Sequence, residues 1–182
     1  MFGEAGDDRL DGRGGRDEIR GGDGDDTLDG GAEDNRLHGE AGDDLLRAAG
    51  GYDVMDGGTG DDTLIGGGWA DEMAGGPGAD RFLFLAAEDS AGRNRDVILD
   101  LSRAEGDRID LSAIDADAPQ PGNQAFTFIG EQGAPGRGEL GSSYVGLVLR
   151  NFLRGNTDDD PEPEFEILVD GRAPLVAGDV IF

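Results

Sequence analysis

Gly21-Gly22-Asp23-Gly24-Asp25-Asp26-Thr27-Leu28-Asp29 and Gly57-Gly58-Thr59-Gly60-Asp61-Asp62-Thr63-Leu64-Ile65 are two copies of one nine-residue pattern. The pattern has glycines at positions 1, 2 and 4, an acid at position 6 and an apolar residue at position 8. It runs nine times without a gap, in blocks that begin at Gly3, Gly12, Gly21, Gly30, Gly39, Ala48, Gly57, Gly66 and Gly75. Glycine permits positive φ and close backbone approach, so the first six residues can wind tightly. The last three residues predict a minimal strand, and the chain is therefore expected to be all-β.

Position 8 of each block predicts the core. Side chains alternate along a strand, so only this position of the three-residue strand points inward. All nine of its occupants are apolar: Leu10, Ile19, Leu28, Leu37, Leu46, Met55, Leu64, Met73 and Phe82. This core is thin, and high charge with low hydrophobicity is typical of disordered chains. We therefore expect the chain to be disordered without a further source of stability.

The charge of the chain excludes several classes of partner. It has 41 Asp and Glu against 15 Lys and Arg, a formal net charge of −26. Such a surface lacks the basic footprint of a nucleic-acid-binding protein and is repelled by anionic membranes. No stretch approaches the ~18 apolar residues of a membrane span. Cysteine is absent, so disulfides and thiolate metal sites are excluded. The expected partner of this surface is a cation, and the spacing of the acids favours calcium.

The blocks resemble the Gly-Gly-x-Gly-x-Asp-x-apolar-x repeats of RTX proteins, which form a parallel β-roll. The resemblance implies that two successive blocks make one 18-residue turn, and that turns of every second block stack on the same edge. It also implies that Ca²⁺ lies between stacked turns, because calcium accepts six to eight oxygen ligands in flexible geometry. The implied ligands are position-6 side chains and turn carbonyls: Asp8, Asp26, Asp44, Asp62, Asp80, Asp17, Asp53, Asp71, Gly6, Gly21, Gly24, Gly39, Gly42, Gly57, Gly60 and Gly75.

The two edges of such a roll differ. The odd-numbered blocks keep glycine at positions 1 and 4 and Asp at position 6 throughout. In the even-numbered blocks Glu33 and Trp69 replace the position-4 glycine, Asn35 replaces the acid, and Ala48-Ala49 replace the leading glycines. We expect four good calcium sites on the odd edge and three weak or empty ones on the even edge. The alternative is that the asymmetry is drift and every slot is filled. Trp69 is expected to contact the turn, with a sugar- or partner-binding role as the alternative.

Residues 84–182 lose the period and form a second expected domain after the roll of residues 1–83. Strands are expected at 96–101, 108–111, 125–129, 144–149 and 165–169, where apolar and polar residues alternate. Glycine and proline separate these segments. The runs 80–84, 96–98 and 106–112 resemble the C-terminal domain of serralysin-type secreted metalloproteases. Asp179-Val180-Ile181-Phe182 resembles the terminal signal that type I secretion machinery reads in that group. A last edge strand that happens to end apolar is the alternative.

Catalytic residues are not expected in this chain. The single histidine, His38, cannot supply a zinc-protease helix, and no Gly-x-Ser-x-Gly motif is present. The expected function is a secreted, extracellular, non-catalytic calcium module that folds on calcium binding after type I secretion. One alternative is the C-terminal part of a secreted protease, lipase or alginate epimerase; another is a free-standing adhesin or matrix protein. Met1 and Phe2 fall on positions 8 and 9 of a preceding block, so the chain is expected to be the rear of a longer exported protein.

Overall fold

The structure is a computed structural model that describes the chain except for residues 117–123, 132–134, 146–149, 159–161 and 172. It consists of strands joined by tight turns, with two short 3₁₀ helices, η1 (Ala87–Ser90) and η2 (Ala177–Asp179). The strands are β1 (Phe2–Ala5), β2 (Arg9–Asp11), β3 (Glu18–Asp23), β4 (Thr27–Asp29), β5 (Arg36–Ala41), β6 (Leu45–Gly50), β7 (Val54–Thr59), β8 (Thr63–Gly68), β9 (Glu72–Ala74), β10 (Arg81–Leu83), β11 (Val97–Ile98), β12 (Arg108–Asp110), β13 (Thr127–Gly130), β14 (Glu139–Val145), β15 (Arg150–Asn156), β16 (Phe165–Asp170) and β17 (Val180–Ile181).

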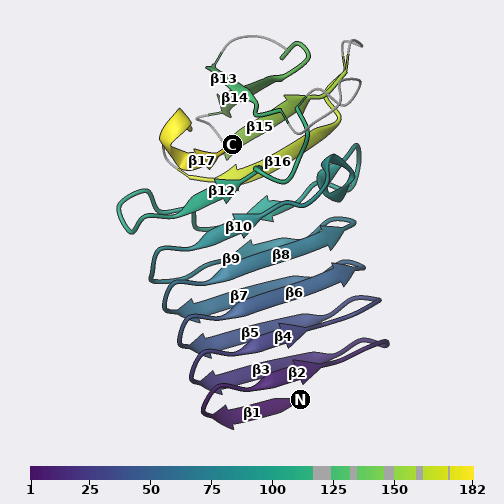
Figure 1. Ribbon diagram of the computed structural model, residues 1–182, viewed down its shortest axis with the longest axis vertical. Helices are drawn as coiled ribbons and strands as arrows, with labels where there is room; N and C mark the ends of the chain where they lie inside the picture. The colour runs from purple at the N-terminus through teal and green to yellow at the C-terminus, as the bar shows by residue number, and fades with distance from the viewer. Residues whose placement is uncertain (117–123, 132–134, 146–149, 159–161, 172) are drawn as a thin grey trace.

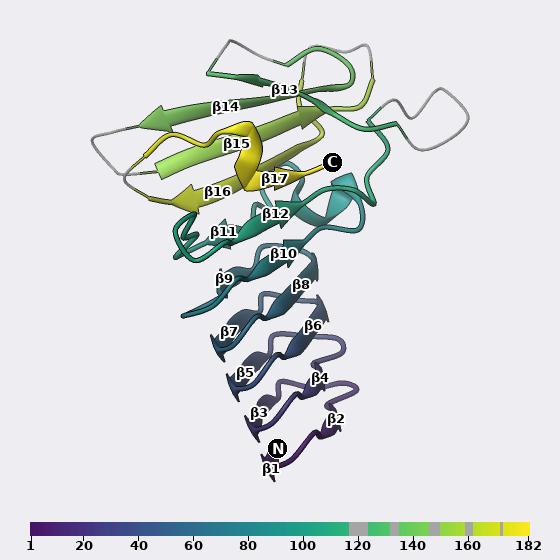
Figure 2. The ribbon, with the colours of Figure 1, turned by 60° about the vertical axis from the view of Figure 1, so that its left-hand side comes forward.

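The repeats form a parallel β-roll with two facing sheets, and this confirms the expected fold class. Strands β1, β3, β5, β7 and β9 pair in parallel in one sheet, and β2, β4, β6, β8 and β10 pair in the other (Figure 1). Each residue pairs with the residue 18 positions later, as Ile19 pairs with Leu37 and Leu28 with Leu46. Two blocks therefore make one turn of the roll. Figure 2 shows the turns stacked along the long axis below the C-terminal strands.

The core of the roll is the expected column of position-8 side chains. From Ile19 to Phe82 these eight residues are at most 1% exposed. Leu10, at the N-terminal end of the stack, is only partly buried. Because each turn contributes just two such side chains, the interior is a narrow apolar strip between the two sheets.

Both sheets continue beyond the last repeat. Strand β11 pairs in parallel with β9, and β12 pairs in parallel with β10. One sheet then extends through β16, β15, β14 and β13. Strand β15 pairs antiparallel with β16 and with β14, whereas β14 pairs in parallel with β13. The division at residue 83 stays a prediction; it marks the end of the nine-residue period, and neither sheet is interrupted there. Antiparallel strands cap the open end of the roll with apolar residues such as Phe165 and Ile167.

The strands of the second half agree only partly with the expectation. The strands expected at 108–111 and 165–169 are β12 and β16, but the one expected at 96–101 is reduced to Val97–Ile98. The expected strand 144–149 begins earlier, as β14, and its residues 146–149 lie outside the described part of the chain. Strand β15 was not expected, because its apolar residues Phe152 and Leu153 are adjacent and do not alternate.

Candidate metal centre

A hydrogen-bonded ladder of position-6 side chains runs along each edge of the roll. Each position-6 residue directly precedes a strand, and its backbone N–H donates to the side-chain Oδ1 of the position-6 residue in the next turn on the same edge. On the odd edge the N–H···Oδ1 distances are 2.7–3.1 Å, and the ladder is Asp8, Asp26, Asp44, Asp62, Asp80 and Asp107. On the even edge they are 2.6–3.0 Å, and the ladder is Asp17, Asn35, Asp53, Asp71 and Asp96.

The second carboxylate oxygen of most ladder residues has no partner. Eight Oδ2 atoms are buried without a hydrogen-bond donor among the described residues: those of Asp17, Asp26, Asp44, Asp53, Asp62, Asp71, Asp80 and Asp96. A buried, ionised oxygen without a donor is costly, and proteins satisfy it with a paired charge or a metal ion. The ladders therefore present a row of positions at which a cation is needed on each edge.

Asn35 is the one ladder residue with an amide, and its nitrogen lies where the aspartates have the Oδ2 atom that lacks a donor. Its Oδ1 takes the usual place in the ladder and accepts the N–H of Asp17. Its Nδ2 donates to the carbonyl oxygen of Glu33 at 2.6 Å and reaches that of Gly31 at 3.5 Å. Aspartate places an oxygen where asparagine has this nitrogen. An aspartate turn thus brings a carboxylate oxygen toward the carbonyls at positions 2 and 4, and a cation there would hold the three acceptors together.

The glycines of the repeat have two distinct roles. A Cβ at the position-1 glycines Gly21, Gly39, Gly57 or Gly75 would overlap the Oδ2 of the position-6 Asp in the same turn, so these glycines leave room for the carboxylate. The position-4 glycines Gly6, Gly24, Gly42 and Gly60 instead have φ between 100° and 133°, the left-handed region that favours glycine. Both roles shape the pocket around the carboxylate.

The electrostatics of the ladder carboxylates confirm that the fold disfavours their ionised form. Burial raises the pKa of Asp62 and Asp71 to about 7, and that of Asp44 and Asp80 to about 6. Burial raises the pKa of Asp96 to about 9. Neighbouring carboxylates add to the rise. A divalent cation beside these groups would lower their pKa and restore the charge.

The donor set fits a hard cation such as calcium. All atoms that converge are carboxylate or carbonyl oxygens, the ligands that calcium prefers. Within the described residues no three His, Cys, Asp or Glu side chains gather in one place. Each ion would therefore take fewer than three carboxylates and complete its shell from backbone carbonyls; position-6 side chains and turn carbonyls are the ligands that the RTX resemblance implies.

The sequence-based reasoning missed the last rungs of both ladders. Asp96 and Asp107 continue the even and odd edges, although they lie 25 and 27 residues after their partners and not 18. Their signal was present: Asp96-Val97-Ile98 and Asp107-Arg108-Ile109 repeat the acid-x-apolar order of positions 6 to 8. The Asp100 carboxylate also caps the last odd turn by accepting the N–H groups of Gly75 and Gly76, both at 3.0 Å.

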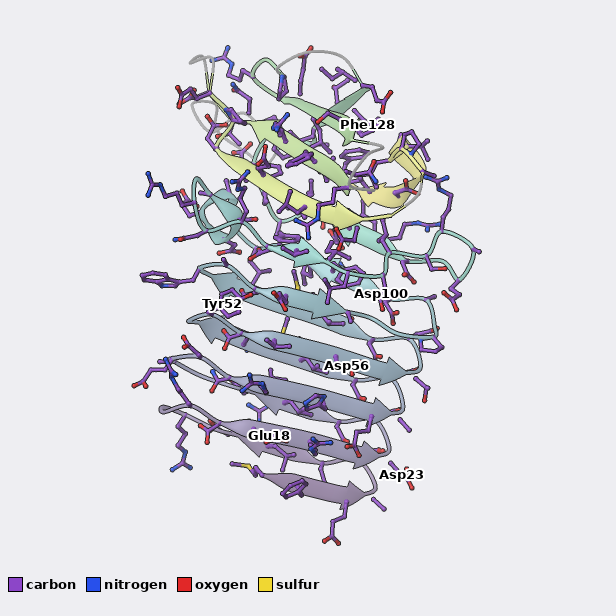
Figure 3. The ribbon with its side chains drawn as sticks, turned by 180° about the vertical axis from the view of Figure 1, so that it is seen from behind. Glu18, Asp23, Tyr52, Asp56, Asp100 and Phe128 are labelled. Atoms are coloured by element: carbon purple, nitrogen blue, oxygen red, sulfur yellow. The ribbon has the colours of Figure 1, made fainter. Side chains whose placement is uncertain are left out.

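A second, exposed row of acids on the odd edge was also missed. Position-5 Asp side chains accept the backbone N–H of the residue 18 positions later, at 2.8–3.1 Å; the acids are Asp7, Asp25, Asp43 and Asp61. Four of the five odd blocks carry this Asp, which is the signal that could have revealed it. Figure 3 shows the two edges from behind, with Asp23 and Asp100 on the edge opposite Tyr52.

Two other residues considered from the sequence lie outside the ladders. His38 lies within β5, where its Nδ1 is 3.8 Å from Asp56 Oδ2. Trp69 is 64% exposed, so it is not buried, and its expected contact with the turn stays a prediction. No helix among the described residues is long and apolar enough to cross a bilayer.

Comparison with known proteins identifies the family. A search of curated proteins found no match. The similar solved structures include two solution structures of subunits of the Azotobacter vinelandii mannuronan C5-epimerase. AlgE6R3 is 30% identical with a TM-score of 0.41, over 99% of this chain and 80% of that one. AlgE6R2 is 29% identical with a TM-score of 0.46, over 92% and 90%. Residues 19–182 match the family described as Peptidase M10 serralysin C terminal, and the chain belongs to that family.

Proposed function

We propose that this chain is a non-catalytic calcium-binding β-roll module whose folding depends on the metal. The observation that carries the proposal is the set of eight buried Asp Oδ2 atoms without a donor, seen against Asn35, whose amide supplies the donor itself. The chain's own residues hold the ion through position-6 carboxylates and turn carbonyls. The ion supplies the positive charge that lets these oxygens converge.

We extend the proposal to the last rungs of the ladders. Asp96 has the same orphaned Oδ2 as the repeat residues, whereas Asp107 Oδ2 accepts the N–H of Ser102 at 2.7 Å. The even edge therefore continues as a metal ladder to Asp96, and the odd edge ends where Ser102 replaces the cation. The weaker even edge remains a prediction. Only Asn35 supports a weaker even edge, because the Oδ2 atoms of Asp17, Asp53 and Asp71 lack a donor among the described residues just as those of the odd-edge acids do.

Metal dependence suits a protein that is exported unfolded. Cytosolic calcium is too low to fill sites with the ~10⁻⁴–10⁻³ M dissociation constants of extracellular modules. In the folded chain the expected signal is partly enclosed: Val180–Ile181 form β17, paired with β12, and Val180 is buried, although Ile181 is 37% exposed. Asp179 is 1% exposed and accepts two hydrogen bonds from Arg103, each at 2.6 Å. Type I secretion machinery would therefore read these residues before folding, and calcium outside the cell would complete the roll.

A second candidate is that the module is the C-terminal part of a secreted enzyme with its catalytic domain upstream. The match to a peptidase C-terminal family favours it. The coding sequence upstream of Met1 tests it: a zinc-binding helix with two histidines four residues apart would support a protease parent.

The direct test of the proposed function is a measurement of bound calcium. Equilibrium dialysis followed by elemental analysis would count ions per chain. Several ions per chain, absent in the presence of chelator and not replaced by magnesium, are the expected result. A chain that binds no calcium at millimolar concentration would contradict the proposal.

A further inference from the structure

An open hollow lies on the even edge of the roll, lined by residues of the turns that precede the ladder side chains. Its volume is about 620 Å³, and it extends over three successive even turns. Its floor consists of residues with little or no side chain, Ala32, Gly50 and Gly51, and its walls include Glu33, Tyr52 and Trp69. Figure 3 shows Tyr52 at this edge. The hollow therefore combines two aromatic rings with a carboxylate.

Trp69 is held in this place in an unfavourable backbone conformation. Its φ is 84°, at position 4 of its block, where the other even blocks have Gly15, Glu33 (φ 73°) and Gly51. A bulky residue with positive φ is a genuine outlier and costs free energy. Burial does not offset that cost, because Trp69 is 64% exposed. Strain of this kind at an exposed aromatic is a feature of ligand sites.

Tyr52 and Asp34 in the lining of the hollow each have a hydrogen-bond or ion-pair partner, whereas the Glu33 side chain has none among the described residues. The Tyr52 hydroxyl donates to Glu72 Oε1 at 2.5 Å, and its backbone N–H donates to Asp34 Oδ1 at 3.1 Å. Asp34 also pairs with Arg16, with an N–O distance of 2.6 Å. The Glu33 side chain is exposed and has no ion pair or hydrogen bond with any described residue. The Tyr52 ring is therefore held in place, and it lines the hollow together with Trp69 and the unpaired charge of Glu33.

These features point to a positively charged ligand. A cation over the face of Trp or Tyr gains ~0.5–2 kcal/mol, and recognition of quaternary ammonium groups uses this geometry. The net charge of −26 repels anionic ligands and concentrates cations. A neutral saccharide would leave the charge of Glu33 unpaired. We propose that Glu33, Tyr52 and Trp69 form a binding site for an alkylated ammonium group, a role independent of calcium binding in the ladders.

The chain carries its own probe for this site, because Trp69 is its one tryptophan. Choline is titrated at constant ionic strength and saturating calcium while tryptophan emission is recorded. The control ligand is 3,3-dimethylbutan-1-ol, which has the same shape as choline without the charge. We expect a saturable change in emission with choline and a much weaker one with the neutral compound. Equal binding of both, or no saturable change with choline, would overturn the proposal.

Variants that retain Trp69 as the fluorophore test whether choline binds at the proposed site. Glu33→Gln and Tyr52→Ala are each expected to weaken choline binding by about twofold to thirtyfold, whereas Tyr52→Phe keeps the ring and most of the affinity. Glu4→Gln is the matched control, since Glu4 is exposed with a φ of 83° but lies on the odd edge. Circular dichroism verifies that each variant is folded. Unchanged affinity in folded Glu33→Gln and Tyr52→Ala would place the ligand elsewhere and refute the site.

Discussion

Replacing Asn35 with Asp should convert a metal-independent turn into a calcium site. The change removes the hydrogen bond from Nδ2 to Glu33 O, which is 2.6 Å long, and places a carboxylate oxygen against two carbonyls. A lost hydrogen bond costs ~0.5–1.5 kcal/mol, and an unsatisfied buried acceptor costs ~1–3 kcal/mol more. At calcium concentrations that leave the new site empty, Asn35→Asp should therefore be less stable by about 1.5–4.5 kcal/mol.

Calcium should reverse this loss. One added site contributes ~2.7 kcal/mol at a hundred times its dissociation constant. The free energy of unfolding should then rise about 1.4 kcal/mol more steeply per tenfold increase in calcium than in the unmodified chain, which corresponds to one more ion. The assay is urea unfolding at a series of calcium concentrations, with bound calcium counted by dialysis. Asp44→Asn is the converse variant and should lower the same slope.

The reasoning fails if Asn35→Asp shows the same stability loss at every calcium concentration and an unchanged slope. That result would mean that the position-6 oxygen does not face a cation. The conclusion drawn from the eight orphaned carboxylate oxygens would then be wrong.

Three further predictions test the stack. Asp44→Asn should raise the calcium midpoint of folding, measured by circular dichroism, more than Asp8→Asn does. The reason is that Asp44 lies between two turns whereas Asp8 lies at the end of the stack. Equal shifts would contradict the stacking of calcium between turns. Gly39→Ala should abolish folding at millimolar calcium, since its Cβ would overlap the Asp44 carboxylate, whereas a Cβ at Gly14 meets nothing within 4 Å and Gly14→Ala should fold normally. Burial raises the pKa of Asp96 to about 9. The metal-free fold therefore binds more protons than the unfolded chain, and its stability falls as the pH rises from ~4 to ~9. Acidifying the metal-free chain from pH 8 to 5 should therefore increase its β signal, and a decrease would contradict this sign.

The repeat region could be predicted closely from the sequence because one nine-residue period determines both its core positions and its turns. A period of nine fixes which residue faces inward, so Leu28 and Leu46 could be assigned to the core and to neighbouring turns. The 18-residue pairing then followed from the RTX resemblance. Position 1 was understood only in part: Gly39 was expected to allow positive φ and close backbone approach, and it has the close approach, to Asp44 Oδ2, without the positive φ.

The second half was harder because its pairing is not local. Asp96 and Asp107 join the ladders across 25 and 27 residues, and an interrupted period hides such distances. Strand β15 lacks alternation and is defined by its neighbours β14 and β16. The hollow beside Trp69 combines three even turns that are 18 residues apart, so its residues could be seen together only in the folded roll.

The central claim is that metal, and not apolar burial, holds this fold together. Far-UV circular dichroism of the purified chain during a calcium titration, with magnesium as the control, tests it most directly. We predict a cooperative transition from coil to β structure near millimolar calcium that magnesium does not produce. A complete β spectrum in the presence of chelator would contradict the account.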